Sequence, residues 1–510
     1  MKKNSIFKTS IFIMSLIIIG KLLAFSKDIV ISSFFGASME TDALFIAFNA
    51  TSIIFVAFYS TISLVFLPLY NEQKLKSNPH DTNLFTSNAI TVYLFITLCI
   101  MTLSIIFAPE IVSLINTSTN TESISLTVKL LRIMTISFLS TIFISFITSI
   151  QLSNEQYLAP HFMPIISSLI VIISTIVFAS KYGIYVPAVA GVFAWVVQTP
   201  LYSWLVRKNF RYSFYLNLKD ENLKKMGFLF LPAFLGISID QANIMVDTIL
   251  ASGLQEGSVS AINYSNRLIS FSSGIFVMAI MSIMYPVFSK YVAINEIEKL
   301  NKAIQRSMRI LLLVMVPITA IIIVYNQEIV SIVFQRGKFD VSATTTTASV
   351  FFFYGLGIVF LALRELFNKV FYAQKNTKTP LFISFIAVST NIALSIILVK
   401  NMGVEGLALA SSISLVVYVI LQVIILRSKI GKDFYHKIGI YMSKILFAAS
   451  LASFFMIKFK IFAYFDNKYI LFLNGIFIGI LIYIIVLFII KNDDIIELYT
   501  KLKIKLQKRI

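Results

Sequence analysis

Charged residues are scarce in this chain. Of its 510 residues, 13% are charged and 58% are hydrophobic, whereas soluble domains average about 25% charged and ~45–50% apolar residues. A soluble globular protein is therefore excluded. At about 20 apolar residues per bilayer crossing, the chain has room for a dozen or more transmembrane helices and none for a large extramembrane catalytic domain.

Metal-binding and cross-linking residues are scarce too. The single cysteine, Cys99, excludes a disulfide framework and a multi-cysteine metal site. The three histidines, His80, His161 and His436, lie far apart in the sequence. The sequence also lacks a Walker A loop and any Ser-His-Asp grouping. We therefore predict a transporter and not an enzyme, with no cofactor other than a possible coupling ion.

Acidic residues are outnumbered, 24 against 43 Lys and Arg, which gives a net charge of +19. In a soluble protein this surplus would suggest a nucleic-acid partner. Here about 28 of the 43 basic residues fall in segments that are cytoplasmic if the N-terminus is inside. The surplus thus predicts membrane orientation, with both termini cytoplasmic, and no nucleic-acid partner. Lys21 interrupts the first apolar run, so we expect a first helix there and not a cleaved signal peptide.

The apolar runs predict an all-α polytopic membrane protein of about fourteen transmembrane helices. Its longest outside loop is expected near residues 326–343. The helices are expected near residues 10–34, 42–68, 86–108, 126–151, 160–180, 184–206, 226–252, 261–289, 308–325, 344–373, 380–399, 404–426, 439–458 and 469–490.

Several landmarks recur along the chain at an offset of about 220 residues. The sequence predicts two parallel six-helix lobes, residues 1–210 and 211–430, followed by residues 431–510 with two extra helices and a basic cytoplasmic tail. Folds of this kind bind substrate between the lobes. The recurring pairs are Asp28 and Asp247, Ser33 and Ser252, Pro68 and Pro286, Pro160 and Pro380, Gly183 and Gly403, and Arg207 and Arg427.

The first expected helix holds three charged residues, Lys21, Lys27 and Asp28. Each charge at bilayer depth costs at least ~2.5–3.5 kcal/mol, so each requires a reason. Asp28 can neutralise one lysine and leave a positive charge facing an anionic substrate. In the alternative interpretation, Lys27 extends to the membrane surface and Lys21 pairs with an acid for structure alone.

Polar residues also share faces on later helices. Asp42 and Asn49 lie seven residues apart on one face of the second helix, which suggests a polar stripe facing water or substrate. Asp42 could instead be a helix cap. Asn263, Tyr264 and Arg267 lie on one face of the eighth helix. The Arg267 guanidinium suits a phosphate group, although it could instead lock the lobes together.

Four further positions are weaker candidates. Arg364, close to Glu365 and Asn368, can line the cavity. The carboxylates of Asp240 and Asp247 and the amide of Asn391 can hold Na⁺ or relay protons, or they can simply pair with basic groups.

Short segments along the whole chain resemble the MviN/MurJ-type lipid II flippases of the multidrug/oligosaccharidyl-lipid/polysaccharide exporter superfamily. The resemblance implies fourteen helices, two lobes and a central cationic cavity for the head group of undecaprenyl-diphosphate-linked peptidoglycan precursor. The matching segments are residues 21–28 (KLLAFSKD), 35–37 (FGA), 41–43 (TDA), 232–236 (PAFLG), 257–260 (GSVS), Tyr264 with Arg267 and Leu268, 334–339 (FQRGKF), 371–373 (FYA) and 378–380 (KTP).

By position, the resemblance implies that Lys21, Lys27 and Arg267 are cavity cations, with Asp42 nearby. The family usually has arginine at the first two positions. Its second helix commonly holds an arginine pair where this chain has Phe55 and Val56.

Together these observations predict a flippase that moves lipid II across the bacterial cytoplasmic membrane by alternating access, driven by membrane potential, Na⁺ or H⁺. Its expected partners are the lipid-linked glycan, membrane lipids and the cell-wall synthesis machinery. One alternative is a flippase for a capsule, teichoic or O-antigen-type lipid-linked oligosaccharide. A second alternative, a membrane glycan polymerase, is disfavoured because the outside loops are short.

Overall fold

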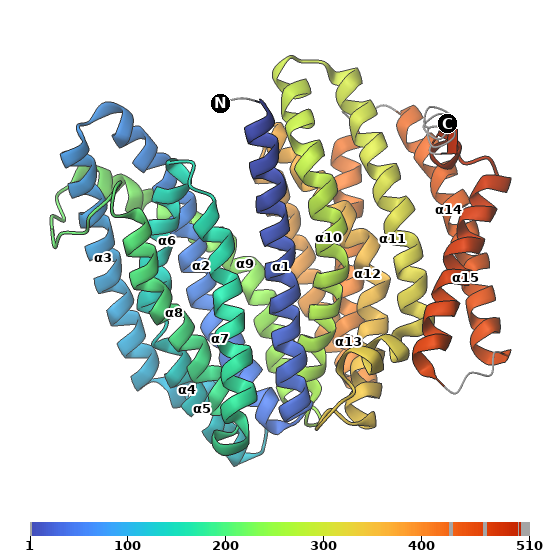
Figure 1. Cartoon of the computed structure of the whole chain (residues 1–510), viewed down its shortest axis with the longest axis horizontal. Helices are drawn as coiled ribbons and strands as arrows, with labels where there is room; N and C mark the ends of the chain where they lie inside the picture. Colours follow the sequence, from blue (N-terminus) through green and yellow to red (C-terminus); the bar gives the residue numbers. More distant parts are fainter. Residues whose placement is uncertain (1–2, 428–431, 463–466, 498, 501–510) are drawn as a thin grey trace. The chain divides into compact units, whose positions relative to one another are not determined.

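The computed structural model describes residues 3–427, 432–462, 467–497 and 499–500, and within these ranges it is helical without strands. Within the described residues, twelve helical segments are long and apolar enough to cross a membrane, one of them being residues Thr121–Ser153, which comprise α5 and α6. The fold is therefore an all-α polytopic membrane fold, as predicted, whereas the number fourteen stays a prediction. The helices (Figure 1) are α1 (Lys3–Phe35), α2 (Met39–Lys76), α3 (Pro79–Ile106), α4 (Ala108–Ile115), α5 (Thr121–Thr135), α6 (Phe138–Ser153), α7 (Leu158–Tyr182), α8 (Tyr185–Val206), α9 (Glu221–Ser252), α10 (Ser258–Ala293), α11 (Ile297–Phe334), α12 (Val341–Ala373), α13 (Lys378–Arg427), α14 (Lys432–Phe462) and α15 (Lys468–Ile489).

Capping residues fix several of the helix starts. Ser38 forms a capping box with Thr41 at the start of α2, and Asp220 accepts hydrogen bonds from the first backbone N–H groups of α9. Asn467 does the same for α15. Such side chains satisfy the donors that a helix start leaves unpaired, so a short polar segment can separate two long apolar helices.

The chain divides into two compact units. The N-terminal unit comprises residues 1–263 together with the short segment 336–343, and the C-terminal unit comprises residues 264–335 and 344–510.

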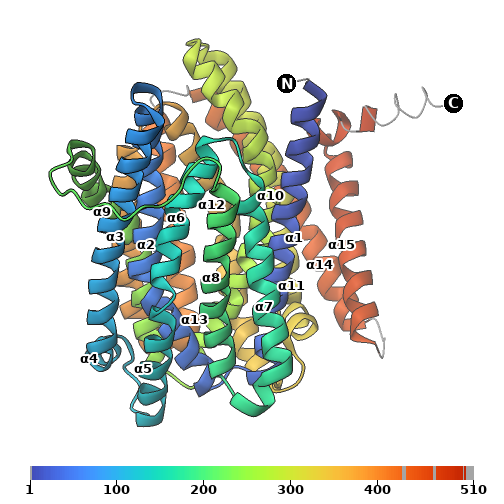
Figure 2. The same cartoon turned by 60° about the vertical axis from the view of Figure 1, so that its left-hand side comes forward.

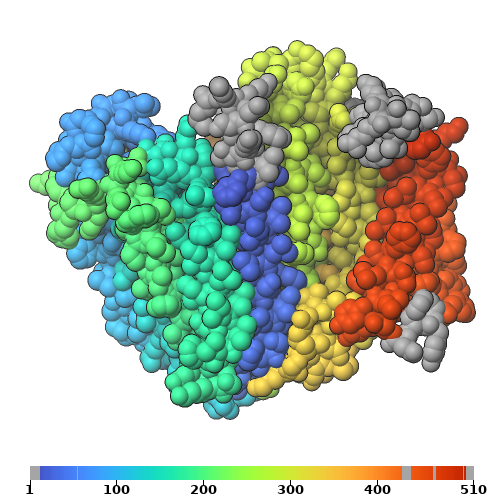
Figure 3. Space-filling view, in the orientation of Figure 1, coloured from blue at the N-terminus to red at the C-terminus, as the bar shows by residue number. Residues whose placement is uncertain are grey.

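In the N-terminal unit, α2 packs against α9, α5 and α6, while α1 lies along α7 (Figures 2 and 3). The core around α2 is rich in aromatic rings. Phe58 makes edge-to-face contacts with Phe138, Phe230 and Phe234, an arrangement that adds to simple burial of apolar area. These contacts tie α2 to α6 and α9.

The extended segment of residues 211–217, here called the α8–α9 strap, is fastened to α3. Asn83 Nδ2 donates a hydrogen bond to the carbonyl of Arg211 at 3.0 Å. Asn88 Nδ2 donates to the carbonyl of Asn217 at 2.8 Å, and the Asn217 N–H donates back to Asn88 Oδ1 at 2.8 Å. The polar side chains of α3 thus replace water as partners for this backbone.

In the C-terminal unit, α14 and α15 pack against each other and against α11 (Figure 1). Gly479 permits the close packing of α15 on α14, because a Cβ at this position would overlap the sulfur of Met456. Helix α11 has a kink at Tyr325, whose φ and ψ are −116° and 23°. Lys460 Nζ donates to the nearby Val324 carbonyl at 3.3 Å and pairs with Glu328 at 2.6 Å, so the kink is satisfied by a side chain of α14.

Backbone geometry recurs with the offset seen in the sequence. Gly183 ends α7 with φ 61° and ψ −149°, and Gly403 interrupts α13 with φ 57° and ψ −135°. Glu155 and Lys375, which are also 220 residues apart, both have φ 57°. The lobe boundaries drawn from the repeats stay a prediction.

Three local predictions were wrong. The sequence placed Pro68 and Pro286 at the ends of the second and eighth helices, but α2 continues through Pro68 to Lys76 and α10 continues through Pro286 to Ala293. The expected loop at 326–343 is also mostly helical, because α11 reaches Phe334 after its kink. Proline and polar residues within long helices are tolerated where neighbouring groups satisfy the freed backbone.

Candidate functional site

The two lysines in the middle of α1, Lys21 and Lys27, have different surroundings. Lys27 Nζ lies 3.8 Å from Asp28 Oδ1, and the Asp28 side chain is 5% exposed. Lys21, two helical turns earlier, is half-buried and forms no ion pair within the described ranges. The described middle of α1 thus carries two lysines and one buried aspartate, which leaves an excess of one positive charge in an apolar helix.

Asp42 is a helix cap. Its carboxylate is buried and accepts hydrogen bonds from the backbone N–H groups of Gly257 and Ser260, both at 2.7 Å, and from the Ser260 hydroxyl at 2.6 Å. These donors lie at the start of α10, where a negative charge is favoured by the helix dipole. Of the two interpretations open in the sequence, the cap is the one that the geometry displays, although the capped helix is α10 and not α2.

Three glycines lie where the α1–α2, α9–α10 and α11–α12 turns meet, here called the glycine junction. Gly36, Gly257 and Gly337 have φ of 72°, 88° and 57°. A Cβ on Gly36 would lie 2.6 Å from the Lys338 carbonyl oxygen, and one on Gly257 would lie 2.7 Å from that of Ala37. Backbone therefore packs directly on backbone here, which only glycine allows.

A backbone hydrogen bond joins two of these turns, from the Lys338 N–H to the Ser33 carbonyl at 2.9 Å. The segments that meet here, 35–37, 257–260 and 334–339, are three of those that carry the family resemblance. Sequence reasoning did not identify them as one site. A glycine shortly before each helix start was the available signal.

Asn49 contributes a contact between helices. Its Nδ2 donates a hydrogen bond of 2.9 Å to Thr248 Oγ1 on α9, and both residues are buried. Asp247, the neighbour of Thr248, is 6% exposed.

Phe55 occupies a position at which the family resemblance leads one to expect a cation. Its ring stacks on Phe138 with a centroid distance of 3.7 Å and belongs to the aromatic core of the N-terminal unit. The adjacent Val56 is 41% exposed. A charged group at position 55 would lose its hydration among rings that offer it no acid.

The residues expected on one face of α10 have different surroundings. Asn263 donates to the Val259 carbonyl of its own helix at 2.8 Å. Tyr264 is fully buried and packs on Phe334, with ring centroids 5.1 Å apart. Arg267 is half-buried. Tyr264 therefore packs in the protein interior, and Arg267 is the charged member of this group.

The weaker candidates have partners of their own. The Arg364 guanidinium lies over the Tyr418 ring at 5.0 Å and is 4.0 Å from Glu365. Asn391 is buried and donates to Ser411 Oγ at 3.0 Å. The side chain of Asp240 lies outside the described residues. Among the residues that the structure describes, no three His, Cys, Asp or Glu side chains cluster as metal ligands.

The fold is that of a known class of membrane transporters. A structure titled as an inward-facing multidrug-resistance MATE family transporter of the MOP superfamily is 13% identical, covers 81% of this chain and 94% of its own, and has a TM-score of 0.62. A structure titled "Lipid II flippase MurJ, inward closed conformation" is more similar, with 26% identity, a TM-score of 0.82 and coverage of 95% of this chain and 100% of that one.

Sequence comparisons narrow the class to one family. The family described as "Lipid II flippase MurJ" matches residues 31–478. A protein of Borreliella burgdorferi named "Probable lipid II flippase MurJ" is 27% identical over 496 residues, 93% of this chain and 94% of its own. A protein of the same name from Buchnera aphidicola subsp. Acyrthosiphon pisum is 30% identical over 412 residues, 78% of this chain and 79% of its own. The chain belongs to the lipid II flippase MurJ family, a family of transporters.

Proposed function

We propose that this protein carries lipid II from the inner to the outer leaflet of the bacterial cytoplasmic membrane by alternating access. The observation that carries the proposal is Lys21, a half-buried cation in an apolar helix that forms no ion pair in the described part of the chain. A cation at this depth costs several kcal/mol unless it meets a charge of opposite sign. The diphosphate of a lipid-linked precursor is such a charge.

The roles of the other cations follow from their surroundings. Lys27 shares its charge with the buried Asp28, so we expect it to hold phosphate more weakly than Lys21 does. Arg267 offers a planar fork that can hold two phosphate oxygens at once. All three are expected to face the substrate in the inward-facing state.

The glycine junction supports a seal on the outer side of the membrane. From the charge distribution of the sequence, we expect the α1–α2, α9–α10 and α11–α12 turns to lie outside and both termini to lie in the cytoplasm. Backbone contacts between these turns would then keep the outer side closed while the head group enters from the cytoplasm. Opening the junction would release the substrate outward.

Energy coupling is proposed to use the membrane potential together with Na⁺ or H⁺. An inside-negative potential is worth ~2.3 kcal/mol per charge per 100 mV. The buried Asp247 and Asn391, with Asp240, are the proposed coupling residues. The cell-wall synthesis machinery is the proposed partner that supplies and consumes the substrate.

The test is complementation of a strain whose own lipid II flippase is depleted, with outward-exposed lipid II as the readout. Lys21→Ala, Lys27→Ala and Arg267→Ala are expected to reduce the amount of outward-exposed lipid II. Of the two lysine changes, Lys21→Ala is expected to have the larger effect. Lys21→Arg, which restores the residue usual in the family, should retain activity. Lys181→Ala, which removes an exposed lysine at the end of α7, is the matched control. Full activity of all three alanine variants would overturn the proposed phosphate contacts.

One observation favours a second candidate, a flippase for another polyprenyl-linked oligosaccharide. The stacked Phe55 stands where the family commonly has a cation, so the head group meets fewer cations than in typical relatives. Purified protein in vesicles, supplied in turn with lipid II and with a capsule or teichoic precursor, separates the candidates by which lipid becomes accessible on the far side.

A further inference from the structure

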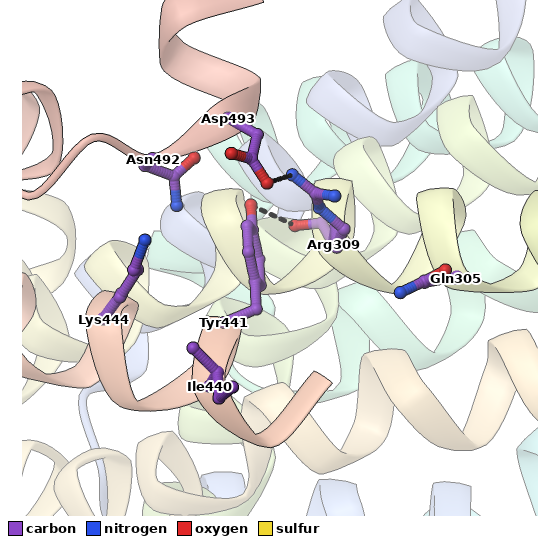
Figure 4. A pocket seen from close by; sticks show the side chains of 7 residues that line it. All are labelled: Gln305, Arg309, Ile440, Tyr441, Lys444, Asn492 and Asp493. Atoms are coloured by element: carbon purple, nitrogen blue, oxygen red, sulfur yellow. Dashed lines mark hydrogen bonds and ion pairs between the residues drawn. The ribbon is translucent and has the colours of Figure 1, made fainter. Parts of the chain in front are cut away.

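A cavity of about 270 Å³ lies in the C-terminal unit between α11, α14 and the turn after α15 (Figure 4). It lies where the charged first turns of α11 give way to apolar residues from Ile310 onward, and just beyond the end of α15 at Ile489. This is the level at which a helix passes from water to lipid, where phospholipid head groups are found. The lining residues are Gln305, Arg309, Ile440, Tyr441, Lys444, Asn492 and Asp493.

One wall of the cavity is a neutralised arginine. Arg309 Nε lies 2.9 Å from Asp494, and its Nη2 lies 3.2 Å from the exposed Asp493. The guanidinium also lies over the Tyr441 ring at 4.7 Å. Arg309 and its two carboxylates together carry a net charge of −1, and their ion pairs hold the turn after α15 against α11.

Asn492 presents a buried donor to this cavity. Its Oδ1 accepts hydrogen bonds from the N–H groups of Asp494 at 3.1 Å and Ile495 at 3.5 Å, which fixes the orientation of the amide. The Nδ2 atom is buried without a hydrogen-bond partner in the described part of the chain, and the residue is 1% exposed. A buried donor without an acceptor destabilises the folded protein by about 1–3 kcal/mol. A ligand oxygen that accepts a hydrogen bond from this Nδ2 atom would remove that penalty.

Lys444 adds a charge beside this donor. Figure 4 shows its ammonium and the Asn492 Nδ2 turned toward one another. Lys444 Nζ donates to the Lys491 carbonyl at 3.3 Å and forms no ion pair within the described ranges. Two donors and the positive charge of Lys444 therefore converge at this cavity, beside the Asp493 carboxylate, which pairs with Arg309.

We propose that this cavity binds the phosphodiester of a membrane phospholipid head group. A phosphodiester carries one negative charge and two free oxygens, which match the charge of Lys444 and the two donors. The cavity volume is several times the ~30 Å³ that a water molecule occupies in the liquid. The exposed Ile440 at its edge offers an apolar surface for the glycerol and acyl chains. The bound lipid would brace α14 and α15 against α11.

The test uses the full-length protein, purified in detergent and stripped of lipid. Native mass spectrometry then measures retention of added phosphatidylglycerol, and a parallel thermal-shift titration compares phosphatidylglycerol with inorganic phosphate. Asn492→Asp keeps the oxygen that caps the turn and replaces the donor with a second oxygen, so it should weaken lipid retention about tenfold, the equivalent of one charge-assisted hydrogen bond. Lys444→Gln should weaken it to a similar degree.

Asn467→Asp is the matched control, because Asn467 caps the opposite end of α15 and accepts from the Tyr469 N–H at 2.9 Å. It should retain lipid as the wild type does. If Asn492→Asp fails to fold, Lys444→Gln decides. Retention equal to wild type in the folded variants overturns the proposal. Stabilisation by inorganic phosphate but not by phosphatidylglycerol would overturn the assignment to a lipid. Neither result bears on lipid II transport.

Discussion

The Asp42 carboxylate accepts two hydrogen bonds from Ser260, one from its backbone N–H at 2.7 Å and one from its hydroxyl at 2.6 Å. The two residues are 218 positions apart, and both are buried. This contact fastens the start of α10 to the start of α2.

Replacing Asp42 is therefore expected to destabilise the protein. Asp42→Ala leaves two buried backbone N–H groups without an acceptor and should cost about 2–4 kcal/mol of unfolding free energy. The measurement is thermal unfolding in detergent with cellular protein level beside it. Asp220→Ala, which removes a partly exposed cap from α9, should cost only about 1 kcal/mol. Equal losses in the two variants would contradict the buried-cap assignment.

Gly337→Ala is expected to disrupt the glycine junction. A Cβ there would overlap the Ser33 carbonyl, and φ at this residue is 57°, so we expect a loss of at least about 1–3 kcal/mol. Gly191→Ala in α8 is the control, because no atom lies within 4 Å of its Cβ position. Stability and lipid II export would be measured for both variants. A Gly337→Ala protein as stable as Gly191→Ala would show that the turns do not pack as described.

The hydrogen bond between Asn49 and Thr248 should appear as an energetic coupling. Asn49→Leu, Thr248→Val and the double variant form a cycle, for which we expect a coupling of about 1 kcal/mol in unfolding free energy. Thr61→Val supplies a control, because the Thr61 hydroxyl donates to the Ala57 carbonyl of its own helix. Additive effects of the Asn49 and Thr248 changes would mean that the two helices are not joined by this bond.

Introducing arginine, the residue type common in the family, at position 55 is expected to destabilise the protein. Phe55→Arg would bring a cation into the stack with Phe138, where no acid among the aromatic core residues pairs with it, and should cost about 3–5 kcal/mol. Phe55→Leu keeps the apolar surface and should cost roughly 1–2 kcal/mol. Protein level and thermal unfolding are the measurements. A stable and more active Phe55→Arg variant would indicate that this position faces the substrate cavity.

Local sequence signals predicted most of the helices but not what the helices do for each other. The repeat of Gly183 and Gly403 was visible because a glycine with positive φ is needed at one position in each copy. The kink at Tyr325 could not be predicted from the local sequence. The Val324 carbonyl beside the kink accepts a hydrogen bond from Lys460, which belongs to a helix more than a hundred residues later.

The candidate site divides in the same way. The charges of Lys21 and Lys27 could be read from the sequence because a charge in an apolar run is conspicuous. The partners of Asp42 could not, since helical periodicity shows which residues share a face and not which turn of the chain meets that face. Tyr264 shared a face with polar residues and yet is buried against Phe334, because an aromatic ring fits either environment.

The α8–α9 strap changes how the connection between the two predicted lobes should be viewed. Its length and charge suggest a slack tether, but its backbone is fastened to α3 from Arg211 to Asn217, and the cap of α9 begins at Asp220. Only Leu218 and Lys219 remain between the two attachment points. Two residues cannot act as a flexible loop. A displacement of α3 would therefore move the first turn of α9 as well.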